Sequence, residues 1–177
     1  MKKTMMAAGF TVMVCLLAAW PNTARAQRGF EPVTADAFNR AVPTDFYLEG
    51  EHTPVEKRNA AVLKNEKGAR VVLALLDTTG WASQMRQKYQ GMLITETKLS
   101  ICGNEIGVGS YGFGLERLPG AAAAQAPFRI YNQAGEKVGE CTAKRDSSIK
   151  QPKPLAVTTA QGGTARLCLG KYVIEIR

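Results

Sequence analysis

The feature that most limits the possible folds is a series of short extended segments separated by turn residues. Val71–Leu76 is a continuous apolar run, which suits a strand buried on both faces. In Tyr111–Leu115, large apolar side chains alternate with Gly112 and Gly114, and this period of two is typical of a strand. The glycines indicate a bend or a close approach of another backbone to that strand.

About nine such segments occur along the chain, with one or two short helices, and no regular alternation of strand and helix accompanies them. A parallel α/β fold would require that alternation. We therefore expect a mostly β fold, namely a single antiparallel β-sandwich or barrel-like domain with one or two short helices.

Two segments carry helical signals, one over residues 34–42 and the other over residues 78–90. In the second, Trp81, Met85 and Tyr89 recur every four residues, so one face of the helix is apolar. Core packing is the favoured role for Trp81, and stacking on a sugar or peptide is the alternative.

Residues 1–26 have the organisation of a secretory signal peptide. A lysine pair is followed by an apolar run, Met5–Trp20, and then by the small-x-small site Ala24-Arg25-Ala26. The apolar run is shorter than the roughly 20 residues that a membrane-spanning helix needs. We therefore predict cleavage after Ala26, a single β-rich domain over residues 27–177, and a periplasmic or secreted location. After cleavage the protein is not expected to be an integral membrane protein.

Removal of the leader also lowers the charge of the chain. The formal net charge falls from +8 to +5, because the leader carries three basic residues and no acidic one. The remaining basic residues are scattered in short clusters with acids nearby. A nucleic-acid groove would need a dense basic stripe with aromatic platforms, so we expect no nucleic-acid partner.

Three cysteines remain after cleavage, and an oxidising compartment allows one disulfide with one thiol left over. Cys102 and Cys141 each lie near turn-like glycine, so we predict that they pair. Cys168 lies in the middle of an apolar strand and is expected to be a free thiol that acts as a small buried hydrophobe. The alternative is three reduced, buried cysteines. The spacing fits no zinc motif, so no metal site is expected.

One nucleotide-binding motif and one possible nucleophile occur in the sequence, but neither has the sequence context that its function requires. Residues 107–112 match G-x-G-x-x-G, but they open a strand rather than the helix that would bind pyrophosphate, so no nucleotide cofactor is expected. Ser110 could be a nucleophile only with His52, the single histidine, and an acid such as Asp77. Nothing in their spacing supports such a triad.

Two sets of acidic residues could in principle form a metal site or a hydrolase active site. Glu49-Gly50-Glu51-His52 could offer metal ligands, but its spacing fits no helical ligand motif, and a solvated loop is favoured. Asp77 and Glu96 could form a glycosidase pair only if the fold sets them at a suitable separation. We therefore assign no catalytic, cofactor-binding or metal-binding residues.

A resemblance to known proteins rests on two segments. Residues 106–116 contain a glycine-led entry into a late strand, and residues 166–172 read Arg-Leu-x-Leu-Gly-x-Tyr. Together they resemble uncharacterised secreted bacterial β-sandwich proteins. The resemblance implies the β fold and export, and it transfers no catalytic residues.

These observations favour a non-catalytic binding or interaction module of the bacterial cell envelope. Its expected partner is an envelope protein or a glycan, and enzymatic activity is not expected. One alternative is a small secreted hydrolase that uses carboxylates on polysaccharide or peptidoglycan. Another is a structural envelope-assembly protein that pairs through a sheet edge.

Overall fold

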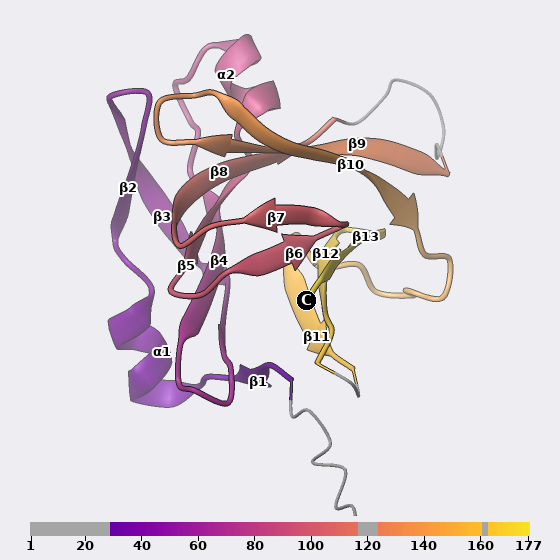
Figure 1. Cartoon of the computed structure of the whole chain (residues 1–177). Coiled ribbons are helices and arrows are strands. Elements are labelled where there is room, and N and C mark those ends of the chain that lie inside the picture. The colour runs from indigo at the N-terminus through magenta and orange to yellow at the C-terminus, as the bar shows by residue number, and fades with distance from the viewer. Residues whose placement is uncertain (1–28, 117–123, 161–162) are drawn as a thin grey trace, which may run out of the picture.

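The computed structural model describes residues 29–116, 124–160 and 163–177 (Figure 1). The predicted leader and its cleavage site after Ala26 lie outside this part of the chain. The described residues contain thirteen strands and two short helices, which confirms the mostly β fold. Their bounds are β1 (Glu31–Pro32), α1 (Ala35–Ala41), β2 (Asp45–Leu48), β3 (Glu51–Lys64), β4 (Arg70–Leu76), α2 (Ser83–Lys88), β5 (Gly91–Thr95), β6 (Leu99–Ile101), β7 (Asn104–Ile106), β8 (Gly109–Leu115), β9 (Gln125–Asn132), β10 (Lys137–Arg145), β11 (Ala156–Thr159), β12 (Ala165–Leu169) and β13 (Tyr172–Ile176).

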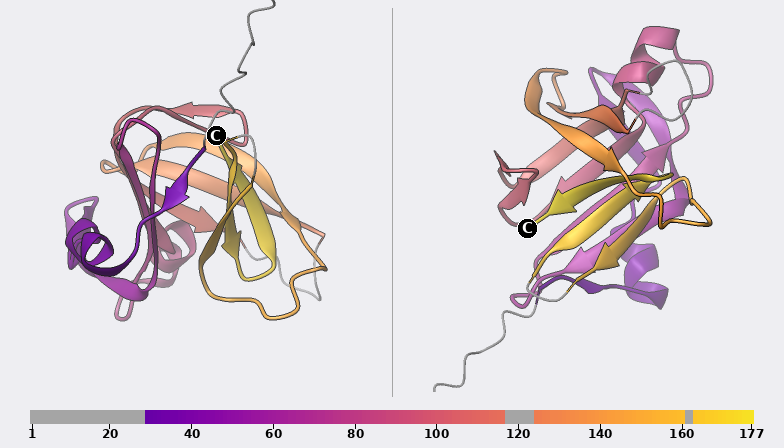
Figure 2. Two further views of the ribbon diagram at one scale, coloured as in Figure 1. Left: turned by 90° about the horizontal axis from the view of Figure 1, so that it is seen from below. Right: turned by 90° about the vertical axis from the view of Figure 1, so that its right-hand side faces the viewer.

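The strands form one antiparallel sheet that curls into a nearly closed barrel (Figure 2). Its main order is β1-β3-β4-β5-β8-β9-β10-β13-β12-β11, with β2 added beside β3 and the β6–β7 hairpin added beside β13. The strand at the end of this order, β11, lies near β3. Val157 of β11 and Ala61 and Leu63 of β3 line a shallow apolar groove there. The two ends of the sheet therefore meet without a ladder of hydrogen bonds between them.

The apolar run of β4 is explained by two hydrophobic clusters, one on each side of the sheet. Val71 and Leu73 face the inner cluster, which fills the barrel with residues from β3 to β13 such as Phe113, Phe128 and Ile174. Val72, Ala74 and Leu76 of the same strand face the outer cluster. The prediction that this strand is buried on both faces is therefore confirmed.

The outer cluster is covered by β2, α1 and α2, which lie against the outside of β3, β4 and β5 (Figure 1). Phe46 and Leu48 of β2 are buried there, and Tyr89 at the end of α2 has no exposed surface. Trp81 packs against this cluster, with its ring centroid 6.3 Å from that of Tyr89. Trp81 therefore packs at the edge of the core, where it is partly buried, although it precedes α2 and does not lie on its apolar face.

The glycines of β8 allow the end of α2 to lie directly on the strand. A Cβ atom at Gly112 would lie 2.6 Å from the Tyr89 ring, and one at Gly114 would overlap the carbonyl oxygen of Lys88. Phe113 and Leu115 point to the opposite face, into the inner cluster. The predicted close backbone approach is therefore the approach of α2.

Two local predictions were wrong in extent. The loop predicted at Glu49–His52 is confined to the turn at Glu49 and Gly50, because Glu51–Pro54 pairs with β2. The helix predicted over residues 78–90 is shorter, because it begins at Ser83 and ends at Lys88.

Candidate functional site

The candidate site lies where β10 and β13 separate. The two strands pair only at Lys144–Val173 and Arg145–Tyr172. Further along, β13 pairs instead with β6, and the backbones of Ser100 and Arg177 exchange hydrogen bonds of 2.7 and 2.8 Å. The β6–β7 hairpin thus fills the gap that opens between β10 and β13 (Figure 1).

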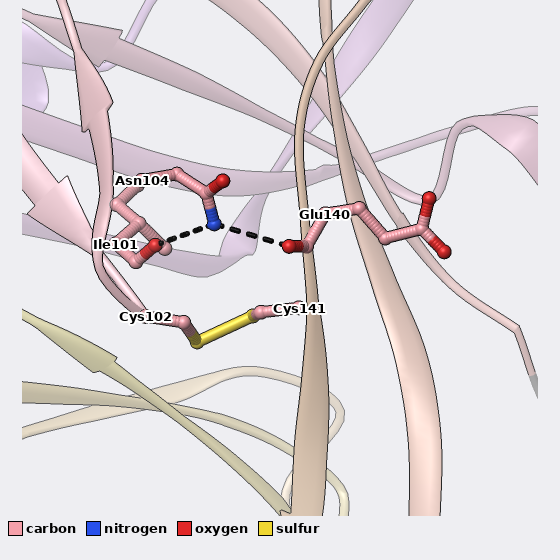
Figure 3. The surroundings of a disulfide bond; sticks show 5 residues. All are labelled: Ile101, Cys102, Asn104, Glu140 and Cys141. Atoms are coloured by element: carbon pink, nitrogen blue, oxygen red, sulfur yellow. Dashed lines mark hydrogen bonds between the residues drawn. A yellow bond between two sulfur atoms is a disulfide. The ribbon is translucent and has the colours of Figure 1, made fainter.

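A cysteine pair attaches this hairpin to β10. Cys102 in the β6–β7 turn and Cys141 of β10 have Cα atoms 6.0 Å apart and lie together as a disulfide pair (Figure 3). This Cα separation is ordinary for a disulfide. Beside the pair, the Asn104 side-chain amide donates hydrogen bonds to the carbonyl oxygens of Ile101, at 3.2 Å, and Glu140, at 3.1 Å. The structure therefore brings together the two cysteines predicted to pair.

A cleft of about 650 Å³ opens on the outer face of the sheet beside this pair. Cys102 and Gly103 form part of its lining, together with residues of β6, β10, β12 and β13 and of the loop after β10. We call it the basic cleft, because its charged lining residues are Lys144, Arg145, Arg166, Arg177, Asp146 and Glu175. The hydroxyl-bearing residues Ser100, Thr142 and Ser147 complete its polar lining.

Three of the four cations that line the basic cleft form no ion pair in the described structure, and the cleft has two more cations than carboxylates. Arg177 pairs with Glu175 at 3.1 Å, whereas Lys144, Arg145 and Arg166 form no ion pair within the part of the chain that the structure describes. These three cations are thus available to an anionic group, which guanidinium and ammonium groups bind by charge-assisted hydrogen bonds.

Asp146 is the acidic residue of the cleft that no cation pairs with directly among the described residues. Its carboxylate instead accepts hydrogen bonds from the backbone and hydroxyl of Ser148, at 2.8 and 2.6 Å. These bonds hold the pKa of Asp146 below its usual value. Asp146 therefore stays ionised and lowers, but does not cancel, the positive charge beside Arg166.

Cys168 has no disulfide partner among the described residues, and the prediction that it is a buried hydrophobe is wrong, because its side chain is only partly buried. Along β12, Ala165, Leu167 and Leu169 face the inner cluster, so Arg166 and Cys168 face outward. Cys168 is half-buried there, opposite Val173, and burial raises the pKa of its thiol. The alternation with Arg166 was the sequence signal for this orientation.

In the described structure, His52 contacts Asp45 and not Ser110 or Asp77, the residues that a catalytic triad would require. Its Nε2 atom lies 3.1 Å from a carboxylate oxygen of Asp45, and its ring packs against Tyr47, with centroids 5.1 Å apart. Ser110 lies on β8, three strands away from β3, which corresponds to about 14 Å across the sheet. Within the described residues, no group of three or more metal-ligating side chains occurs.

Asp77 and Glu96 also remain far apart. Glu96 pairs with Arg70 at the start of β4, and Asp77 follows the end of the same strand. Seven residues of extended chain span more than about 20 Å, whereas glycosidase carboxylates lie within about 10 Å of one another. Asp77 instead accepts a hydrogen bond of 3.0 Å from the backbone of Thr79.

Glu49 joins a cluster that sequence reasoning missed. Its carboxylate accepts hydrogen bonds from Lys88 and from the buried Tyr89. The Lys88 ammonium lies 5.0 Å from the ring centroids of Tyr89 and Tyr131. Burial, together with the hydrogen bond to Glu49, raises the pKa of Tyr89 to about 12, and the bond from Lys88 lowers the pKa of Glu49.

This cluster connects three separate segments. The Glu49 backbone donates a hydrogen bond of 2.8 Å to the carbonyl oxygen of Gln133, in the β9–β10 turn. Glu49 therefore attaches the β2–β3 turn to both α2 and the β9–β10 hairpin. Its hydrogen bonds join elements of the fold to one another, so we assign it a structural role.

No family model, curated protein or solved structure matches this chain. The resemblance to secreted bacterial β-sandwich proteins therefore stays a prediction. Neither helix in the described part of the chain is long and apolar enough to cross a membrane.

Proposed function

We propose that this protein is an exported, non-catalytic binding or interaction module of the bacterial cell envelope, and that the basic cleft is its ligand-binding surface. The observation that carries the proposal is the set of three cations, Lys144, Arg145 and Arg166, which line one cleft without forming ion pairs in the described structure. Cationic side chains that form no ion pair within the described residues are suited to hold an anionic group of a partner.

The carboxyl groups support a non-catalytic role over the hydrolase alternative. A general acid at neutral pH needs a raised pKa, which enzymes obtain by burying the carboxyl group. In the described chain the buried polar residues are Thr53 and Thr95, neither of which is acidic. The pKa values of Glu49, Asp77 and Glu96 are shifted downward, because each carboxylate accepts hydrogen bonds.

The proposal is tested by retention on envelope material. The secreted wild-type chain is passed over immobilised envelope fractions and over a glycan array. A cleft variant carries Lys144→Gln, Arg145→Gln and Arg166→Gln. A control variant carries Lys57→Gln, Arg58→Gln and Lys67→Gln, three exposed cations of β3 and the turn after it.

Both variants lose three positive charges, so they differ only in where the charge is removed. We expect retention of the wild type and of the control variant, and loss of retention for the cleft variant. A blank result for the wild type on every fraction and on the array would contradict the proposal. Equal retention of all three proteins would show that binding does not use the cleft.

A further inference from the structure

We infer that the basic cleft recognises an acidic polysaccharide, a chain that carries carboxylate or phosphate groups at intervals. This inference rests on the proposed function and specifies the chemistry of its ligand. It follows from how the cations are spaced, from what else lines the cleft and from how open the cleft is to solvent.

The cations are spread over the cleft and do not converge on one point. Lys144 lies opposite Val173, and Arg166 lies opposite Glu175, on the far side of β13. The spacing of strands and residues in a sheet puts the Cα atoms of Lys144 and Arg166 about 12 Å apart. Arg145, which follows Lys144 at the end of β10, is the third unpaired cation among the described lining residues. A ligand with several separated anionic groups matches this arrangement better than a single small anion.

The remaining lining favours a glycan over an acidic protein. Apart from the charged groups, it includes the hydroxyls of Ser100, Thr142 and Ser147, which suit the hydroxyl and ring oxygens of sugars. Val173 is its one aliphatic side chain among the described lining residues, and no aromatic ring is present there. Protein interfaces generally bury a larger apolar centre that is enriched in aromatic residues.

Because the described lining has no aromatic ring, a sugar cannot stack there, and this favours a charged sugar over a neutral one. A neutral polysaccharide would have to be held by hydroxyl groups alone, in an open cleft where water competes for the same hydrogen bonds. Charge-assisted bonds from Lys144, Arg145 and Arg166 are stronger than neutral ones. Binding should therefore depend on the anionic groups and weaken with salt.

The test uses polymers that share one backbone. Binding of the secreted chain to dextran, carboxymethyl-dextran and dextran phosphate is measured by calorimetry, with poly-L-glutamate as the acidic peptide. We expect at least one of the charged dextrans to bind, and dextran to bind at least about tenfold more weakly. Which charged dextran binds better identifies the preferred anionic group.

The same two variants locate the binding. The cleft variant should lose affinity by about tenfold or more, and the control variant should stay within about twofold of wild type. Raising the ionic strength from low to physiological values should weaken the binding of wild type and of the control variant more than that of the cleft variant. A control variant that loses as much affinity as the cleft variant would overturn the inference, since charge alone would then explain binding.

Other results separate this inference from the proposed function. Stronger cleft-dependent binding of poly-L-glutamate would assign an acidic protein as the ligand, and equal binding of neutral dextran would assign a neutral glycan. Either outcome refutes the acidic polysaccharide and leaves the binding module intact. If no polymer binds but envelope retention requires the cleft, the ligand class is wrong. If neither depends on the cleft, both proposals fail.

Discussion

Gly114 provides the space in which the backbone of α2 contacts β8. A Cβ atom there would overlap the Lys88 carbonyl group, which belongs to the backbone and cannot move aside as a flexible side chain would. We expect Gly114→Ala to lower the free energy of unfolding by about 2 kcal/mol, measured by urea denaturation. Gly107→Ala is the matched control, because its Cβ would lie 3.6 Å from the nearest neighbour. Equal stability of both variants would contradict this assignment.

Glu49 makes a contribution to stability that depends on pH. Hydrogen bonds from Lys88 and Tyr89 depress the pKa of Glu49 in the folded protein below its ordinary value of 4.5. Its stabilising effect is therefore complete above that value and is lost as the pH falls through the folded-state pKa. We expect Glu49→Gln to lower the free energy of unfolding by about 1 kcal/mol at pH 7.

The difference between wild type and Glu49→Gln should shrink below pH 4.5 and disappear in acid, which denaturant titrations at several pH values will measure. Glu51→Gln is the control, because Glu51 is exposed and forms no ion pair in the described structure. A difference that stays constant down to the lowest pH would mean that the ionised Glu49 carboxylate is not responsible.

The cysteine pair joins the β6–β7 hairpin, whose strands are three residues each, to β10. Cys102 and Cys141 are 39 residues apart in sequence, so their bond closes a long loop in the unfolded chain. We expect the Cys102→Ala, Cys141→Ala double variant to lose about 2–4 kcal/mol of unfolding free energy. Amide hydrogen exchange over residues 99–106 should also accelerate. Cys168→Ala, which removes the free thiol, should change stability by less than about 1 kcal/mol and leave this exchange unchanged.

The strands that form hairpins were predictable because their signals are local. The pairs β3–β4 and β9–β10 follow from apolar segments around turn residues, and Gly112 and Gly114 indicated a close approach. The continuation of β3 through Glu51–Pro54 was missed, because Thr53, the residue that this segment buries, is polar and its neighbours are exposed. Local patterns report a buried face through apolar side chains, and a buried threonine gives no such signal.

The basic cleft could not be predicted, because it exists only in the closed sheet. Lys144, Arg166 and Arg177 are distant in sequence and come together through the pairing of β10, β12 and β13 and the insertion of β6. That pairing depends on long-range contacts, which no local pattern encodes. The sequence analysis describes the basic residues as scattered, and in the folded molecule four of them line one cleft.

Export and the thiol state of the whole molecule are linked, since a stable disulfide needs an oxidising compartment. When the complete chain is produced in a Gram-negative bacterium, we expect the periplasmic product to begin at Gln27, as measured by intact mass. Iodoacetamide under denaturing conditions should then label one thiol, Cys168, and label three after reduction.

Ala26→Asp should block cleavage by removing the small residue at the predicted site. The same domain produced without residues 2–26 should stay in the reducing cytoplasm and present three thiols before any reductant is added. A full-length wild-type chain retained in the membrane would instead identify the leader as an anchor.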